Sequence, residues 1–306
     1  MFWRRFRRDR WAVAGGIAII IIILLAIFGA PLAAAITDHS VNEKFFYEMT
    51  DEFGSAKGPT LSNDGGVFIF GGDSLGRDVL VRILYGARAS LTVALMATVM
   101  ELVIGVGLGL TAGFYRGKVD TFISRASDVV LTLPVLLLAA GLASACSGTR
   151  EGCLGGLIKP GLPLVATIIG LFSWPYIFRI IRGQVLSLRE KEFVEASRSL
   201  GAGGGRIVRK EILPNVVAPI IVYATLIIPT NILFEAALSF LGLGIPASIP
   251  SWGRMLDEAS SNGVQYTPWL MLFPGLFLLV TTLAFNLLGD GLRDALDPKS
   301  AATLEA

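Results

Sequence analysis

The stretch WAVAGGIAIIIIILLAIFGAPLAAAI, residues 11–36, contains no charged side chain. One helical crossing of a bilayer needs about 20 mostly apolar residues, so this stretch is long enough to span a membrane. Hydrocarbon offers no hydrogen-bond partners, and a lone span must therefore satisfy its own backbone as a helix. The stretch is also longer than the apolar part of a cleaved signal peptide, about 7–15 residues, although it follows the basic sequence MFWRRFRRDR. We interpret it as a retained first span.

The rest of the chain repeats this pattern. Of its 306 residues, 53% are hydrophobic and only 16% are charged, which excludes an ordinary soluble domain. Five further apolar runs approach the length of a span, and only the first of them holds a charge, Glu101: 90–115, 129–145, 160–178, 213–234 and 268–289. The sequence therefore predicts an all-α integral membrane protein with six transmembrane helices.

The basic residues predict the orientation of these helices. Of the 26 Lys and Arg residues, 18 lie in segments that share one side if the chain starts in the cytoplasm: 1–11, 116–127, 179–212 and 290–306. Basic residues accumulate on the cytoplasmic side. We expect both termini to be cytoplasmic.

Three regions follow from this topology. Residues 1–36 form a basic N-terminus and the first span, residues 37–89 an extracytoplasmic segment, and residues 90–306 a core of five helices. Within the outer segment, residues 71–88 have apolar side chains at helical spacing among several charges. This pattern predicts an amphipathic helix on the outer surface that leads into the second span. A solvated linker is the alternative.

The second span has glycines at 105, 109 and 113, and hence on one helix face. Such a stripe of small residues lets another helix approach closely. Glu101 in the same span and Glu235 in the fifth are carboxylates in intramembrane positions. Intramembrane carboxylates are rare and often functional. For Glu101 we consider an interhelical hydrogen bond, a protonated acid near the membrane interior, or a contact with a substrate.

Cys146 and Cys153 are the only cysteines, and both fall in the outer loop between the third and fourth spans. An oxidising compartment would permit a disulfide between them, and two free thiols are the alternative. The single histidine, His39, lies in another loop, so we expect no metal site.

A polar stretch, EASRSLGAGGGRIVRKEILPN (195–215), interrupts the apolar runs between the fourth and fifth spans. Phe193, Ala196, Ser197 and Leu200 recur at helical spacing, and Gly201 suits the left-handed residue that ends a helix. The sequence predicts a short amphipathic helix here. Its apolar stripe either fits a groove in a partner or packs on the cytoplasmic face of this chain.

These residues resemble the EAA loop of ABC importer permeases, whose pattern is EAA-x-x-x-G followed by Leu-Pro. The loop would cover about residues 186–214, and the matching positions are Glu195, Ala196, Ser197, Gly201, Leu213 and Pro214, with Leu200 beside the glycine. Ser197 replaces the usual second alanine. Gly203, Gly204 and Gly205 add glycine that the family usually lacks, and we expect the second half of the loop to be less helical.

The resemblance extends to the dipeptide, oligopeptide and nickel branch of that family. Its lead-in motif has a Gly-Arg-Asp core, here Gly76, Arg77 and Asp78 within SLGRDVLVRILYGARASLTVAL. The segments EAALSFLGLGIP, which contains Glu235, PSWGRML and LAFNLLGDGLRDALDP follow in the order of the branch.

The resemblance implies a multi-pass subunit of a prokaryotic plasma (inner) membrane, forming half of a translocation pore and working with other proteins. The implied partners are a second homologous permease, two cytoplasmic ATP-binding-cassette ATPases and an extracytoplasmic substrate-binding protein, besides membrane lipid; no nucleic acid is implied. ATP and Mg would bind to the ATPases, and no cofactor to this chain. The sequence agrees, because it holds no G-x-x-x-x-G-K-[ST] phosphate loop: Lys118 alone follows a glycine, and Val119 comes next.

The sequence gives less support to two other classes of function. A stand-alone secondary transporter or channel would need charged relay residues in several spans or paired broken helices. An intramembrane enzyme would need grouped His, Asp or Ser residues. The sequence predicts a pore subunit without catalytic or metal-binding residues.

Overall fold

The structure, a computed structural model, describes residues 3, 6–52, 55–61, 66–147, 158, 161–261 and 266–296. In this part of the chain the regular secondary structure is helical, apart from isolated bridges such as Thr50–Ala56. The helices are α2 (Arg10–Leu24), the π-helical turn η1 (Leu25–Gly29), α3 (Ala30–Thr37), α4 (Phe46–Met49), α5 (Val79–Tyr115), α6 (Gly117–Thr132), α7 (Val135–Ser147), α8 (Leu162–Leu188), α9 (Glu192–Ser199), α10 (Gly204–Ile207), the π-helical turn η2 (Val208–Ile212), α11 (Leu213–Phe240), α12 (Trp252–Ser261) and α13 (Trp269–Leu296).

Five continuous helices among the described residues are long and apolar enough to cross a membrane: Arg10–Thr37, Val79–Tyr115, Leu162–Leu188, Gly204–Phe240 and Trp269–Leu296. These helices correspond to five of the six predicted apolar runs, and each extends beyond its run at one end or at both. Among the described residues of the five runs, only Gly161 and Pro268 lie outside the helices, because α8 and α13 begin just after them. The all-helical, membrane-spanning prediction is confirmed.

The predicted third span over residues 129–145 is not one straight helix. α6 ends at Thr132, α7 begins at Val135, and the two helices meet at an angle of 81°. Proline disfavours helical backbone in the residue before it, and Leu133, which precedes Pro134, is extended. The sixth crossing therefore exists only if this bent pair counts as one broken span.

The glycine stripe of α5 packs against α8, as its spacing predicts. A Cβ atom added to Gly109 would lie 2.9 Å from the Cβ atom of Ile181, and one added to Gly113 would lie 2.7 Å from the Cβ atom of Val185. Gly105 meets Ile177 in the same way. These close approaches make α5 and α8 the central helix pair of the bundle.

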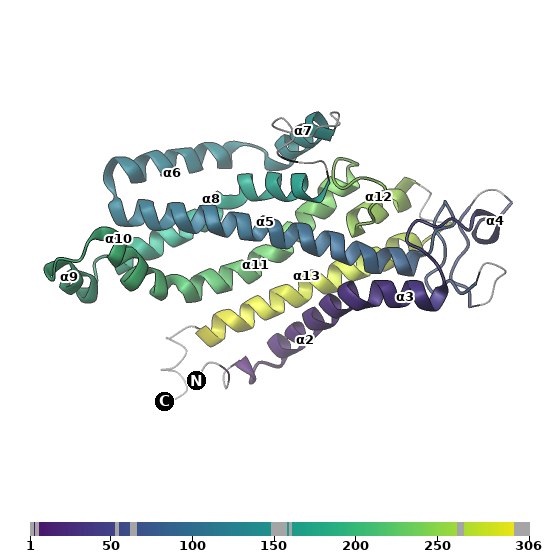
Figure 1. Cartoon of the computed structure of the whole chain (residues 1–306), viewed down its shortest axis with the longest axis horizontal. Coiled ribbons are helices and arrows are strands. Elements are labelled where there is room, and N and C mark those ends of the chain that lie inside the picture. Colours follow the sequence, from purple (N-terminus) through teal and green to yellow (C-terminus); the bar gives the residue numbers. More distant parts are fainter. Residues whose placement is uncertain are drawn as a thin grey trace.

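The first span, formed by α2, η1 and α3, lies along α13 and the N-terminal half of α5 (Figure 1). In a π-helical turn the backbone hydrogen bonds depart from the pattern of the α-helix. At η1 the Arg88 guanidinium of α5 donates hydrogen bonds to the carbonyl oxygens of Ala26 and Ile27. This contact fixes the first span to the core.

The two ends of the bundle differ. α9 and α10 lie at one end, together with the start of α2 and the end of α13, whereas α4 and α12 lie at the opposite end (Figure 1). The predicted topology requires this arrangement. The side of the membrane that each end faces stays a prediction, and we call the end with α4 and α12 the outer end.

The prediction of an amphipathic surface helix over residues 71–88 is right only in part. Residues 71–78 are not helical, whereas Val79 begins a helix that continues without a break into the second span, as predicted. The surface position is wrong, because Arg82 is fully buried. Asp73, Arg77 and Arg82 pair with opposite charges inside the protein.

Candidate functional site

The helix of the loop between the fourth and fifth spans is α9, and it ends as predicted. Gly201 has a left-handed φ of 79°. Its N–H donates to the carbonyl of Arg198 at 3.0 Å, and the N–H of Ala202 donates to that of Ser197 at 3.0 Å. These two bonds form the Schellman motif, in which glycine is favoured because it has no Cβ atom.

One residue of α9, Val194, attaches this helix to the rest of the chain. The predicted apolar stripe did not include it. Val194 is fully buried, whereas Phe193 is 38% exposed and Leu200 is 88% exposed. Ala196 is exposed as well, and Ser197 is half-buried. The predicted apolar stripe is therefore covered only in part by this chain. Its C-terminal end at Leu200 lies open at the end of the bundle, which favours the alternative of a groove in a partner.

Val194 joins α9 to three long helices. Its hydrophobic cluster contains Phe114 at the end of α5, Ile181 and Val185 of α8, and Ile212 and Val216 around the start of α11. Arg189, just before α9, donates to the carbonyl of Phe114 at 2.7 Å. Val194 and Arg189 therefore connect α9 with the ends of α5, α8 and α11 through one shared hydrophobic cluster.

The second half of the loop is more helical than its glycines predict. Backbone between α9 and α10 is non-helical only over residues 200–203, and the helix resumes at Gly204 and runs to Phe240. Leu213 and Pro214 lie at the start of α11, directly after the π-helical turn η2. Packing supplies the reason, since Ile207 and Ile212 are buried in the same cluster as Val194.

The lead-in motif shapes the start of α5. Gly76 has a φ of 73°, and a Cβ atom there would lie 2.5 Å from the carbonyl carbon of Phe45. Asp78 caps α5, because its Oδ1 accepts from the N–H groups of Leu80 at 2.8 Å and Val81 at 3.2 Å. Its Oδ2 lies 2.8 Å from Nδ1 of the buried His39.

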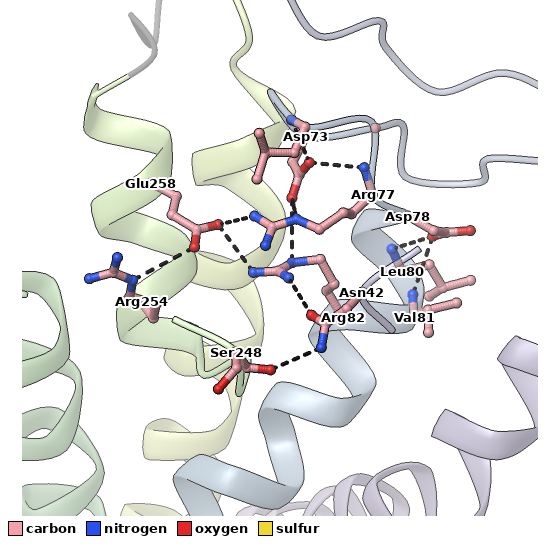
Figure 2. Close-up of polar contacts among 12 residues, drawn as sticks. Asn42, Asp73, Arg77, Asp78, Leu80, Val81, Arg82, Ser248, Arg254 and Glu258 are labelled. Atoms are coloured by element: carbon pink, nitrogen blue, oxygen red, sulfur yellow. Dashed lines mark hydrogen bonds and ion pairs between the residues drawn. The ribbon is translucent and has the colours of Figure 1, made fainter. Parts of the chain in front are cut away.

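Arg77 belongs to a buried ion cluster at the outer end (Figure 2). Its Nε lies 2.6 Å from Asp73 Oδ2, and its Nη2 lies 2.8 Å from Glu258 Oε2 on α12. Arg82 adds a contact of 3.1 Å between Nη2 and the same Glu258 oxygen. Arg254 of α12 lies with its Nε 3.7 Å from Glu258 Oε1, so three cations surround these two carboxylates (Figure 2). Each buried charge of the cluster thus has a partner of opposite sign, as burial requires.

Sequence reasoning missed this cluster. Asp73 and Arg77 are four residues apart, and their opposite charges were a usable signal. Glu258 lies on another helix, far along the chain, so that one sequence could not connect it with Arg77.

Glu235 lies in a buried polar group where α5, α11 and the start of α12 meet. Ser90 Oγ donates to its Oε2 at 2.8 Å, and Ser239 Oγ donates to its Oε1 at 2.7 Å. The N–H of Trp252 lies 3.4 Å from Ser90 Oγ. These bonds give Glu235 a structural place between the helices.

Glu101 is also buried, on the face of α5 toward α11. Within the described part of the chain its Oε1 has no hydrogen-bond partner, and Asn231 of α11 donates through Nδ2 to Thr98 Oγ1 at 3.0 Å. The interhelical hydrogen bond, the protonated acid and the contact with the solute all stay predictions for Glu101.

Cys146 is buried near the end of α7, and Cys153 lies outside the described residues, so the disulfide stays a prediction. Among the described residues, no group of three or more His, Cys, Asp or Glu side chains could hold a metal ion.

Comparisons with known proteins agree with this architecture. A family model for the binding-protein-dependent transport system inner membrane component matches residues 105–301. A second model, for the N-terminal transmembrane domain of oligopeptide transport permease C, matches residues 1–50. Together the two models cover both the core and the first span.

Similar proteins match over nearly the whole chain. The dipeptide transport system permease protein DppC of Alkalihalophilus pseudofirmus is 41% identical, covering 97% of this chain and 88% of the relative. The oligopeptide transport system permease protein OppC of Bacillus subtilis is 38% identical, covering 96% and 88%. The fold resembles that of the MetNI methionine ABC transporter in an inward-facing conformation, with a TM-score of 0.55 and 20% identity over 70% of this chain and 96% of that chain. The chain therefore belongs to the family of inner-membrane components of binding-protein-dependent transport systems and is a permease subunit of an ABC importer.

Proposed function

We propose that this chain forms half of the translocation pathway for peptides or related small solutes, and that α9 couples the pathway to ATP hydrolysis by other subunits. The solute class is supported by relatives named for dipeptide, oligopeptide and glutathione transport. The residues proposed for coupling are those of the EAA-like loop, with Glu195, Gly201 and Pro214 among them.

The proposed complex contains a second homologous permease, two cytoplasmic ATPase subunits and an extracytoplasmic substrate-binding protein. ATP and Mg bind to the ATPase subunits, because the sequence of this chain has no phosphate-binding loop. In the inner membrane, the end of the bundle with α9 faces the cytoplasm, as the basic residues predict.

The observation that carries the proposal is the open apolar stripe of α9. Leu200 is 88% exposed directly beside the helix end, and Phe193, about two helical turns before it, is partly exposed. Burying a leucine side chain in a partner contributes about 1.5–3 kcal/mol. The Schellman motif at Gly201 holds Leu200 in a fixed orientation, so a partner meets a prepared surface.

The contacts of α9 provide the route for coupling. When ATPase subunits close, a helix seated in them moves with them. Val194 then transfers the movement to the buried ends of α5, α8 and α11, since interiors are packed too densely to absorb a shift locally.

Purification and reconstitution test the proposal. We expect two ATPase subunits to co-purify with the chain, and ATP hydrolysis in vesicles to rise when the binding protein and its solute are added. Leu200→Ala should weaken this stimulation by about tenfold, which corresponds to about 1.4 kcal/mol. Solute uptake driven by an ion gradient without ATPase subunits would contradict the proposal and support a secondary transporter.

A further inference from the structure

A groove of about 470 Å³ opens at the end of the bundle that carries α9. We call it the α11 groove, because α11 supplies most of its lining, from Asn215 to Leu226. α8 adds Gln184 to the lining, and α13 adds Arg293 and Leu296. The residues from α8 and α13 lie near the ends of these helices, so the mouth of the groove is at the same end as α9 (Figure 1).

The groove ends inside the bundle where α11 and α13 touch. A Cβ atom added to Gly289 of α13 would lie 2.7 Å from Cδ2 of Leu226. This close contact leaves no space between the two helices at that level. From Asn215 at the mouth to Leu226 at the inner end, the groove follows about 16 Å of α11.

The lining changes from polar to apolar along this length. At the mouth the polar side chains of Gln184, Asn215 and Arg293 are exposed. At the inner end Val222 is buried and Leu226 is half-buried. α8 and α13 are each about 40 Å long, whereas the hydrocarbon core of a bilayer is about 30 Å thick. A bundle centred in the bilayer therefore places the mouth among the lipid headgroups and the inner end among the acyl chains.

Two groups at the mouth offer charge and a hydrogen-bond acceptor. Arg293 is exposed and, within the described part of the chain, makes no ion pair. Pro219 of α11 has no N–H group, so the carbonyl oxygen of Asn215 loses the helical hydrogen bond that residue 219 would otherwise donate. A cation and a carbonyl oxygen are therefore available to a ligand that carries a negative charge and a donor group.

We propose that the α11 groove binds one anionic phospholipid of the leaflet at the α9 end, with the phosphate at Arg293 and an acyl chain along Val222 and Leu226. A phosphate forms charge-assisted hydrogen bonds with a guanidinium, and a headgroup hydroxyl, as in phosphatidylglycerol, can donate to the carbonyl of Asn215. A transported peptide is the poorer occupant, because its polar groups would lose water at the inner end without gaining hydrogen bonds there. The inference goes beyond the proposed function and does not depend on it.

The charge part is tested by titrating phosphatidylglycerol into the delipidated complete complex in mild detergent and counting bound lipid by native mass spectrometry. We expect the first phosphatidylglycerol to bind more tightly than phosphatidylcholine, whose headgroup also carries a cation. In Arg293→Gln its dissociation constant should rise about tenfold, since a charge-assisted contact is lost. Arg125→Gln is the matched control, because it removes an exposed arginine of α6 outside the groove and should leave the dissociation constant unchanged.

Ala218→Phe tests the groove itself. Ala218 is part of the lining, so a phenyl ring there occupies the space of the lipid without changing any charge. Binding of phosphatidylglycerol should weaken as it does in Arg293→Gln. A loss in Arg293→Gln without a loss in Ala218→Phe would place the lipid outside the groove and overturn the inference. Equal affinity for the two lipids, or unchanged affinity in Arg293→Gln, would overturn it as well.

Two soluble competitors distinguish other occupants of the groove. Glycerol phosphate carries the anionic group without acyl chains, and a dipeptide represents a transported solute. Neither compound should displace phosphatidylglycerol. Displacement by glycerol phosphate would indicate a site for free phosphate compounds, and displacement by the dipeptide would assign the groove to the translocation pathway. Either result would overturn the lipid assignment.

Discussion

Substitution of Gly201 tests whether α9 is the coupling element. The residue has a φ of 79°, and a Cβ atom there would meet no heavy atom within 4 Å. The only cost of a side chain is therefore backbone strain, about 1–2 kcal/mol for an ordinary L-residue in the left-handed region and less for Asn or Asp. Neither the spans nor their packing is affected, so every variant should insert in the membrane.

Three variants separate strain from charge. Gly201→Asn should couple almost normally, because asparagine tolerates this conformation. In Gly201→Ala the solute-stimulated rate of ATP hydrolysis should fall roughly fivefold, the factor that corresponds to about 1 kcal/mol of backbone strain. Gly201→Asp should lose nearly all of it, because it places a charge beside Leu200 in the partner contact, where an unpaired charge is costly.

The assay is ATP hydrolysis by the reconstituted complex with and without the binding protein and its solute. The amount of permease in the membrane and of co-purified ATPase is measured for each variant. Normal stimulation in Gly201→Asp would refute the coupling role of this loop. An equal loss of stimulation in Gly201→Asn and Gly201→Asp would show that charge does not cause the effect.

Further predictions concern packing, the ion cluster and topology. Gly109→Ala should lower the thermal stability of the purified chain, because its Cβ atom would lie 2.9 Å from that of Ile181. Gly107 faces open space on the same helix, so Gly107→Ala should keep or raise the thermal stability. Equal effects of the two substitutions would contradict the close helix contact. Arg82→Met should destabilise by about 3 kcal/mol, and by less when Glu258 is already Gln, as measured in a double-mutant cycle; a constant cost would show that the two residues are not coupled. In a Cys146→Ser, Cys153→Ser background, a cysteine at Ser199 should react only with reagents on the cytoplasmic side and one at Ser261 only from outside, and the reverse pattern would overturn the orientation.

The sequence predicts features that depend on local physics. Apolar runs of sufficient length locate the long helices, since the bilayer sets their length. Gly201 marks the end of α9 because few other residues accept its backbone conformation. The spacing of Gly105, Gly109 and Gly113 predicts a close helix partner, although it does not say which helix that is.

The features that the sequence does not predict depend on distant contacts. The charges of residues 71–88 suggest a surface helix, but Arg77 and Arg82 can be buried because Asp73 and the distant Glu258 pair with them. Gly204 and Gly205 disfavour a helix, but buried neighbours override that preference. The bend before Pro134 has a signal in the sequence, but the apolar run around it suggests a straight span.

The long helices differ in how well they can transmit a displacement. α5 has 37 residues without an internal proline, which corresponds to a length of about 55 Å. α8, α11 and α13 all contain proline, at Pro175, at Pro219 and Pro229, and at Pro274. Each internal proline removes one backbone hydrogen bond and favours bending.

α5 therefore acts as the stiff member of the bundle, and its two ends carry the contacts that matter. At the outer end it is capped by Asp78 and tied to α12 through Arg82 and Glu258. At the other end Phe114 packs in the cluster of Val194 and accepts a hydrogen bond from Arg189. Because one continuous helix reaches from the ion cluster at the outer end to the hydrophobic cluster that holds Val194 of α9, we expect events at the two ends of the bundle to be mechanically linked without a dedicated series of side chains between them.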